Sequence, residues 1–143
     1  MEAHACPFCA IVMGRADANI VARFDSVIAF FPQHPASLGH TLVVPADHVE
    51  DIWSLDVATA SKLSEATLNV ARAVKDAVEP EGLNIIQSNG EAATQTIPHL
   101  HIHVLPRWNG DGIGPIWPED SAEVPGSLER VLERLRSSLG GRA

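Results

Sequence analysis

Residues 98–107 constrain the fold of this chain more than any other stretch, because histidines alternate there with apolar residues. The histidines are His99, His101 and His103, and the apolar residues are Leu100, Ile102 and Val104. Alternate side chains of a β-strand share a face, so we expect the imidazoles on one face and the aliphatic side chains in a core. Pro98 and Pro106 lack amide hydrogens, and they predict the two ends of this strand.

Three aligned histidines are compatible with three kinds of site. They can be polar residues with a purely structural role, they can bind a metal ion, or they can carry nucleophilic catalysis. An imidazole acts as a nucleophile when another group orients it and fixes its tautomer. Strand neighbours two residues apart lie close enough to provide that group, so the pattern favours catalysis.

The same residues resemble the signature of the histidine triad (HIT) superfamily of nucleotide hydrolases and transferases. That signature is His-apolar-His-apolar-His-apolar-apolar, and residues 99–105 fit it at every position. The continuation Leu105-Pro106-Arg107, with Gly110-Asp111 shortly after, is most similar to the branches that cleave dinucleoside polyphosphates.

The resemblance implies a covalent mechanism in which His101 attacks the α-phosphate of a nucleotide conjugate. The product of this attack would be a nucleotidyl-histidine intermediate, which water then resolves. His99, His103 and His40 complete the implied set of catalytic histidines, because Gly39-His40 matches a fourth family histidine beside the phosphate site. The expected substrates are purine nucleotide conjugates, either dinucleoside polyphosphates or nucleoside phosphoramidates.

Two other functions remain open. A nucleotide-binding regulatory module would use the triad for binding with little turnover, and a zinc hydrolase would use all three triad histidines as metal ligands. Pro32 keeps the first alternative open, because the family usually has Asp or Asn at this position to hold the ribose hydroxyls. Proline has neither a side-chain acceptor nor an amide hydrogen.

The resemblance also implies which residues contact the nucleotide. The candidate walls of a purine pocket are Phe8, Ile11, Phe30 and Phe31. The candidate contacts with the α-phosphate or the leaving group are Ser88 or Asn89, Gln95 and Thr96. From the residues alone, apolar positions at strand spacing are core and a polar loop is a turn, so these roles depend on the nearby triad. Arg107 is open between a phosphate contact and a solvated side chain.

The only two cysteines, Cys6 and Cys9, form a Cys-x-x-Cys pair near the N-terminus. A structural disulfide is not expected without a signal peptide. Such a pair is half of a tetrahedral zinc site whose other ligands must come from elsewhere, and the alternative is two unligated thiols. Resemblance to bacterial HIT proteins with the same pair implies a structural zinc held by Cys6, Cys9, His48 and His99, with no catalytic cofactor.

Length and charge set broader bounds. A chain of 143 residues suits one domain, and the resemblance, which covers roughly residues 6–111, implies a single HIT domain over residues 1–143 with a C-terminal extension of about 112–143. Ten basic and eighteen acidic residues give a net charge of −8, which argues against nucleic-acid and anionic-membrane partners. No leader-like segment or apolar run of about 18 residues is present, so we expect a cytoplasmic protein.

Hydrophobic patterning predicts an α+β domain in which an antiparallel sheet packs against one long helix, with a second helix near the C-terminus. The predicted strands outside the triad are 20–24 and 27–31, joined by a turn at Asp25-Ser26, then 39–45 and 83–87. The predicted helices are 56–78, with Asp56 as its N-cap and Leu63, Ala66, Val70, Val74 and Ala77 on its apolar face, and one that Ser127 caps and Gly140-Gly141 ends. HIT proteins usually join their sheets, so the resemblance implies a homodimer.

Overall fold

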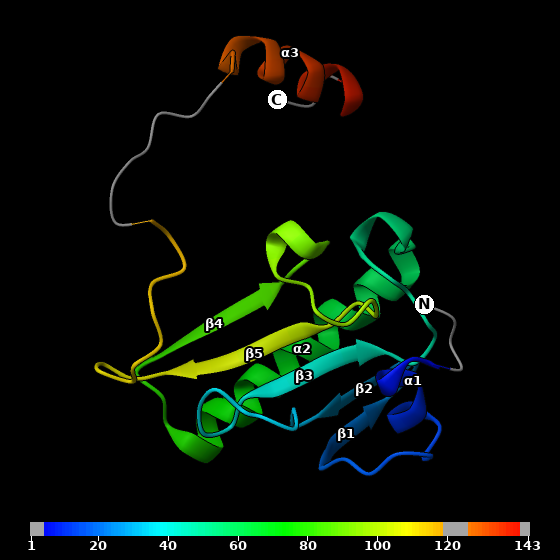
Figure 1. The fold of residues 1–143 in the computed structure, drawn as a ribbon, viewed down its shortest axis with the longest axis vertical. Coiled ribbons are helices and arrows are strands. Elements are labelled where there is room, and N and C mark those ends of the chain that lie inside the picture. The colour runs from blue at the N-terminus through cyan, green and yellow to red at the C-terminus, as the bar shows by residue number, and fades with distance from the viewer. Residues whose placement is uncertain (1–4, 119–125, 141–143) are drawn as a thin grey trace. The chain divides into compact units, whose positions relative to one another are not determined.

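Five antiparallel strands in the order β1-β2-β3-β5-β4 form the centre of residues 1–113 (Figure 1). The strands are β1 (Ile20–Phe24), β2 (Val27–Phe30), β3 (Thr41–Pro45), β4 (Gly82–Gln87) and β5 (Ile102–Arg107). The structure is a computed structural model that describes residues 5–118 and 126–140. Residues 114–143 form a second unit. The antiparallel sheet with its packed helices confirms the predicted α+β class.

The long helix α2 (Val57–Val78) covers one face of this sheet. It begins where predicted, because the Asp56 carboxylate accepts a hydrogen bond from the Thr59 amide at 2.9 Å. Its apolar face packs against sheet residues in one cluster: Val27, Ala29, Val43, Leu63, Ala66, Val70, Val74, Leu100 and Val104. The prediction was wrong at Ala77, which is exposed. Val78 packs in its place, because the last turn meets the loop at Gly39, where an added Cβ would lie 3.3 Å from Val78 Cγ2.

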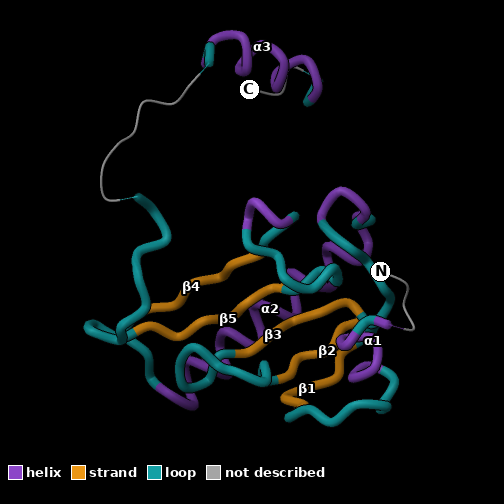
Figure 2. The backbone as a smooth tube through the Cα atoms, in the orientation of Figure 1, coloured by secondary structure: helices purple, strands orange, loops and turns teal. Residues whose placement is uncertain are grey.

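The opposite face of the sheet carries a second apolar cluster, built around the short helix α1 (Pro7–Val12). Its buried members are Cys6, Phe8, Cys9, Ile28, Phe30, Leu42 and Val44. Every residue of β2 and β3 is therefore buried, since alternate side chains of these strands enter the two clusters in turn. The sheet lies between α2 and α1, and long loops precede β3 and β5 (Figure 2).

The strand that contains the triad differs from its predicted bounds. It begins at Ile102, so His103 lies within β5, while His99 lies in a bend and His101 in the irregular segment before the strand. Pro106 lies inside β5 and does not end it. A proline is tolerated there because the pairing of β3 with β5 stops at Val104. The predicted alternation still holds, with Leu100 and Val104 in the cluster below α2 and His99 against α1.

Three other strand ends moved by one or two residues, among them the start of β4, which lies at Gly82 and not at Leu83. β2 ends at Phe30, one residue before the predicted end. β3 begins at Thr41 and not at Gly39, because Gly39 has a φ of +84°, which interrupts an extended strand.

The second unit contains the helix α3 (Leu128–Ser138), as predicted. The Ser127 hydroxyl accepts a hydrogen bond from the Arg130 amide at 3.3 Å and caps its first turn. Its apolar residues Leu128, Val131, Leu132 and Leu135 are exposed. Gly140 follows the helix, and Gly141 lies outside the described residues. Among residues 5–118 and 126–140, no helix combines the length and hydropathy needed to cross a bilayer.

We predict that Leu63→Ala lowers the free energy of unfolding by about 2–5 kcal/mol, because Leu63 is 2% exposed at the contact between α2 and the sheet. Leu68→Ala is the matched control on the same helix. Leu68 is 50% exposed, so its truncation should change stability by no more than about 0.5 kcal/mol. Urea unfolding of both variants measures the difference, and equal losses would contradict this packing.

Candidate active site and metal centre

A backbone carbonyl fixes the tautomer of His101. Its Nδ1 lies 2.7 Å from the His99 carbonyl oxygen, which can only accept a hydrogen bond. Nδ1 therefore carries the ring proton, and Nε2 keeps a lone pair. The side chain is 7% exposed, so little freedom remains for the ring to turn. This is the arrangement that a histidine nucleophile requires.

A chain of hydrogen bonds fixes the tautomers of His40 and His103 in the same way. The Ala36 amide donates to His40 Nδ1 at 3.0 Å, so the proton of His40 is on Nε2. His40 Nε2 then donates to His103 Nδ1 at 2.9 Å. His103 must carry its own proton on Nε2, which is left as a donor. The rings of His101 and His103 are 5.0 Å apart between centroids, so this donor lies beside the His101 imidazole.

These histidines are held in their neutral forms. Burial lowers the pKa of His40 and of His101 below the ordinary value of a histidine. Burial, with additional effects from His101 and His40, lowers the pKa of His103 to about 4. An unprotonated imidazole at neutral pH is the form that can attack an electrophile.

A second cluster brings together Cys6, Cys9, His48 and His99, the four residues that the resemblance implied as metal ligands. Their ligand atoms all lie within 4.8 Å of one another. The Cys6 Sγ to His99 Nδ1 and Cys9 Sγ to His48 Nδ1 distances are both 3.4 Å. A tetrahedral zinc ion with ordinary bond lengths separates its ligands by about 3.3–3.8 Å, so these atoms fit a single ion.

The surroundings of the cluster also suit a cation. His99 Nε2 donates to the Pro45 carbonyl oxygen at 2.9 Å, which leaves the Nδ1 lone pair directed at the two sulfurs. Burial and the neighbouring Cys6 thiol raise the pKa of Cys9 to about 11, so the Cys9 thiolate needs a positive charge beside it to form at neutral pH. A bound dication supplies that charge.

The three triad imidazoles do not converge on one point. His99 faces the cysteines, His101 Nδ1 faces a carbonyl oxygen, and His103 pairs with His40. Within the described residues the Cys6, Cys9, His48 and His99 group is the one that could hold a metal ion. The geometry therefore does not support a zinc hydrolase in which all three triad histidines are ligands.

The predicted purine-pocket residues divide into two groups. Phe8, Ile11 and Phe30 share the cluster around α1, and the rings of Phe8 and Phe30 meet edge to face with their centroids 5.4 Å apart. Phe31 is outside that cluster and is 41% exposed. Because Phe8 is 6% exposed and Phe30 is 1% exposed, their rings present little surface to a base.

The predicted phosphate loop is held in place by two of its own side chains. Asn89 Oδ1 accepts from the Ile52 amide at 2.7 Å. Gln95 accepts from the Gly90 amide at 2.7 Å and donates to the Glu50 carbonyl oxygen at 2.8 Å. These side chains join the loop to the segment after β3.

The other two predicted phosphate contacts, Ser88 and Thr96, are differently placed. Their hydroxyls make no hydrogen bond to other described residues, which leaves them available as donors. Thr96 is exposed and Ser88 is half-buried. Asn89 Nδ2 donates one of its two hydrogens to Gln87 Oε1 at 2.7 Å, so its second hydrogen is a further unused donor, whereas Gln95 Nε2 already makes two hydrogen bonds.

The last residue of β3 and the segment that follows it supply partners that the sequence could not reveal, because they are backbone groups. The Pro45 carbonyl oxygen accepts a hydrogen bond from His99 Nε2, and the Val49 carbonyl oxygen accepts one from the Leu100 amide at 2.6 Å. The Ala36 amide that fixes His40 is a further example. No residue type marks such a group in advance, and only the position of His48 pointed to this segment.

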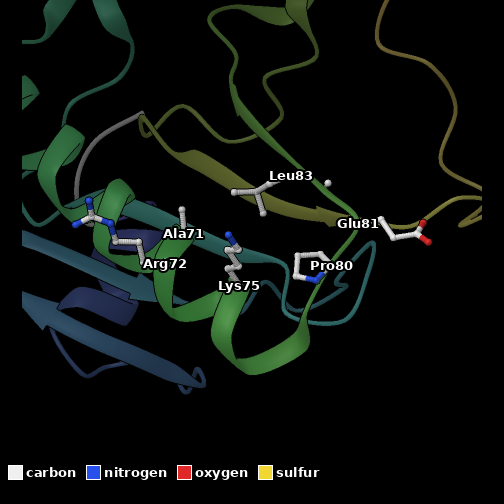
Figure 3. Close-up of a pocket in the computed structure, with 7 residues that line it drawn as sticks. Ala71, Arg72, Lys75, Pro80, Glu81 and Leu83 are labelled. Atoms are coloured by element: carbon white, nitrogen blue, oxygen red, sulfur yellow. The ribbon is translucent and has the colours of Figure 1, made fainter.

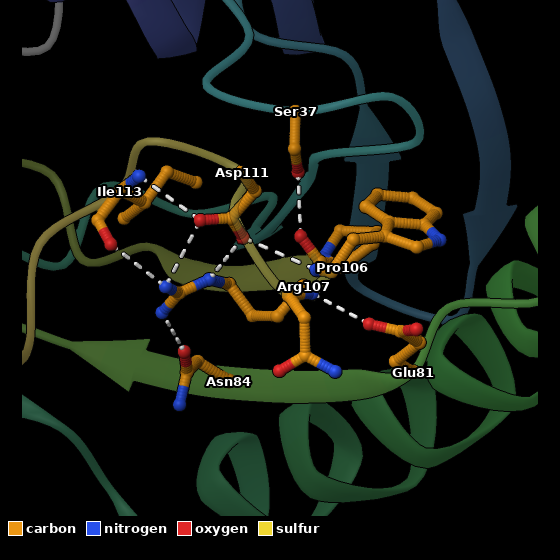
Figure 4. Close-up of polar contacts among 9 residues, drawn as sticks. Ser37, Glu81, Asn84, Pro106, Arg107, Asp111 and Ile113 are labelled. Atoms are coloured by element: carbon orange, nitrogen blue, oxygen red, sulfur yellow. Dashed lines mark hydrogen bonds and ion pairs between the residues drawn. The ribbon is translucent and has the colours of Figure 1, made fainter.

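Arg107 has a structural role that differs from both alternatives considered for it (Figure 4). Its Nε donates to Asp111 Oδ2 at 2.7 Å, and its other nitrogens donate to Asn84 Oδ1 at 2.7 Å and to the Ile113 carbonyl oxygen at 3.0 Å. The guanidinium holds the pKa of Asp111 well below its usual range. Arg107 thereby fixes the loop after β5 against β4.

Comparison with known proteins shows which protein family this chain resembles. The HIT domain family matches residues 13–110. The chain is similar to the Bacillus subtilis protein hit, with 36% identity over 142 residues that cover 93% of this chain and 96% of the relative. It is also 33% identical to the adenosine 5'-monophosphoramidase hnt1 of Schizosaccharomyces pombe, over 92% of this chain and 98% of the relative.

A solved structure relates the fold to a metal-bound protein. The zinc-bound histidine triad family protein of Mycobacterium smegmatis superimposes with a TM-score of 0.73 and 30% sequence identity. The match covers 99% of this chain and 100% of that protein.

Proposed function

The chain belongs to the HIT domain family, an enzyme family of nucleotide-binding hydrolases and transferases, and from this we propose that it cleaves nucleotide conjugates at the α-phosphate. The observation that carries the proposal is the His101 ring, which is neutral, buried and hydrogen-bonded through Nδ1 to the His99 carbonyl oxygen. This leaves one nitrogen, Nε2, with a lone pair for attack.

In the first step, His101 Nε2 forms a bond to the α-phosphorus while the bond from phosphorus to the leaving group breaks in line with it. The ring becomes cationic, and the His99 carbonyl oxygen stabilises the Nδ1 proton. Water then attacks the same phosphorus from the side opposite His101, loses a proton to solvent, and returns Nε2 with its lone pair. The leaving group departs with the bonding electron pair and takes a proton from solvent, so the products are the nucleoside monophosphate and the protonated leaving group.

The donors around this nitrogen would stabilise the charge that builds up on the phosphate oxygens. His103 Nε2 carries a proton because His40 occupies the other ring nitrogen at 2.9 Å. The hydroxyls of Ser88 and Thr96 would bind further oxygens. Asn89 and Gln95 would act mainly by fixing the loop, since their side chains already bond to backbone groups. Donors set in advance stabilise a transition state without reorganisation.

A purine nucleoside phosphoramidate is the substrate class that we favour. The relative from Schizosaccharomyces pombe is named as an adenosine 5'-monophosphoramidase, and it aligns over 92% of this chain. Dinucleoside polyphosphates present the same α-phosphate and are the second class to test. Pro32 offers no acceptor to a ribose hydroxyl, so sugar recognition would depend on other groups.

We predict that His101→Ala lowers hydrolysis of adenosine phosphoramidate at least about a thousandfold, because the nucleophile is removed. Intact-mass analysis after rapid quenching should detect a nucleotidyl adduct on the unsubstituted protein and none on the variant. His34→Ala is the control, since His34 is an exposed histidine outside the site. Full activity of His101→Ala would refute the mechanism, and tight binding without adduct or product would favour the regulatory module.

We also propose that a structural zinc ion occupies the Cys6, Cys9, His48 and His99 cluster. The distances between the ligand atoms support this, as does the zinc-bound histidine triad relative. When bound, zinc supplies a positive charge that keeps both thiols ionised and a crosslink between distant parts of the chain. Its ligands would join α1, the segment after β3 and the segment before β5.

Metal analysis tests this assignment. The purified protein should contain about one zinc per chain, and Cys6→Ser should lower both the zinc content and the thermal stability, because a structural site depends on its thiolates. Thr41→Ser is a buried control outside the cluster and should retain zinc. Full zinc content in Cys6→Ser would exclude this ligand set.

The homodimer that the resemblance implies would form at β4. This strand is an edge of the sheet, and Ile85 on it is 50% exposed. A pocket of about 330 Å³ lies beside it, between β4 and α2, and is lined by Ala71, Lys75 and Leu83 among others (Figure 3). The other edge strand, β1, has a register shift between Ile20 and Ala22, which disfavours regular pairing. A second copy would therefore add its own β4 to this one.

We predict that Ile85→Lys converts the dimer to a monomer, because it places a charge in the apolar surface that the second copy would cover. Val21→Lys makes the same change on the other edge strand, where Val21 is 42% exposed, and should leave the mass unchanged. Light scattering after gel filtration measures the mass of each. A monomeric unsubstituted protein, or equal effects of both substitutions, would rule out pairing through β4.

A further inference from the structure

We propose that the metal centre at Cys6, Cys9, His48 and His99 positions the His101 imidazole, through the His99 carbonyl oxygen and the Phe8 ring. This goes beyond a stabilising crosslink, because it makes the rate of the covalent step depend on the metal. It rests on the proposed function in two respects, the assignment of His101 as the nucleophile and the metal ion at this cluster. Phe8 is then a positioning residue, in addition to its place in the apolar cluster.

The first connection runs through a single residue. The His99 ring directs Nδ1 toward Cys6 Sγ at 3.4 Å and Cys9 Sγ at 3.5 Å. The carbonyl oxygen of the same residue accepts from His101 Nδ1 at 2.7 Å. Because the His99 side chain is 0% exposed and also bonded to Pro45, a metal that fixes the ring fixes the carbonyl as well.

The second connection runs through α1. Phe8 lies between the two cysteines in sequence, so both thiol ligands flank it on the same short helix. The Phe8 ring meets the His101 ring nearly perpendicularly, at 84°, with the centroids 5.3 Å apart. It also contacts His99, at 5.8 Å and 72°. The position of α1 therefore determines how tightly the His101 ring is packed.

A bound metal would add a coordination crosslink between α1 and distant parts of the chain. The helix has six residues, too few to be stable by itself. Among the described residues, the hydrogen bonds from residues 5–16 to more distant parts of the chain are those of the two thiols with His48 and His99, and one from Arg23 to the Val12 carbonyl oxygen at 3.4 Å. Without the ion, these weaker hydrogen bonds and the apolar packing of α1 would hold Phe8 against His101, and the directed bonds of a coordination site would be lost.

The predicted phosphate loop does not depend on these contacts. Gln95 and Asn89 join it to Glu50 and Ile52 with hydrogen bonds that involve no metal ligand. Loss of the metal should therefore slow the chemical step and leave substrate binding nearly unchanged. A defect of folding would instead lower binding and the rate together.

The test compares zinc-loaded protein with protein depleted by a chelator, at one fixed pH, after circular dichroism has shown that both are folded. In spectra of protein with ¹⁵N-labelled histidine, the His101 Nδ1–H signal should be sharp in the loaded protein and lost or averaged after depletion. Single-turnover nucleotidylation should fall about tenfold or more with KM nearly constant, and both readouts should return when zinc is added back.

Variants separate the two connections and keep the test decisive if depletion unfolds the protein. Phe8→Leu keeps an apolar side chain between the cysteines but removes the ring, so it should broaden the His101 signal and slow nucleotidylation while zinc stays bound. Ile28→Ala truncates a 3% exposed residue of the same cluster that makes no ring contact with His101, and its His101 signal should stay sharp.

Two results would overturn the inference. One is an unchanged His101 signal and nucleotidylation rate in folded, depleted protein, and the other is an identical spectral effect of Phe8→Leu and Ile28→Ala. Failure of the proposed function gives a different result, because loaded protein would then form no adduct while the His101 signal still responded to the metal.

Discussion

The buried contact between His99 Nε2 and the Pro45 carbonyl oxygen holds together two parts of the chain that are far apart in sequence. It joins the end of β3 to the segment before β5, and it decides which nitrogen of His99 keeps a lone pair. From that choice follow the direction of Nδ1 toward the cysteines and the place of the carbonyl that His101 requires. The same hydrogen bond therefore stabilises the fold and orients the residues of the candidate site.

The histidines of the candidate active site follow the same principle. His101 and His103 each have one ring nitrogen bonded to a partner, so the other nitrogen is in a defined protonation state, and His40 uses both of its nitrogens to set this state for His103. Burial keeps these rings neutral, since little water reaches them to stabilise a charge. Nucleophilic attack by an imidazole depends on a fixed tautomer. Here backbone groups, the Ala36 amide and the His99 carbonyl oxygen, fix the tautomers.

The sequence predicted the features that depend on side-chain pattern. Alternation along residues 99–104 separated core from site, Asp56 marked the start of α2, and the cysteine pair pointed to the cluster that His48 completes. The features it could not predict depend on the backbone. β5 begins where Ile102 pairs with Gln87, the last residue of β4. The partners of His40 and Leu100 are an amide and a carbonyl that any residue could supply. Arg107 was undecided because its partners, Asn84 and Ile113, are brought to it only by folding.

The register shift in β1 has a consequence for assembly at high concentration. A sheet with two regular edges can add copies without limit, which leads to fibres. Here the irregular pairing at Ile20 and Ala22, with Arg23 beside it, blunts one edge. Pairing of β4 with the β4 of a second copy would cover the other edge, so association would stop at a dimer with a twofold axis. The chain could then be abundant in a cell without polymerising.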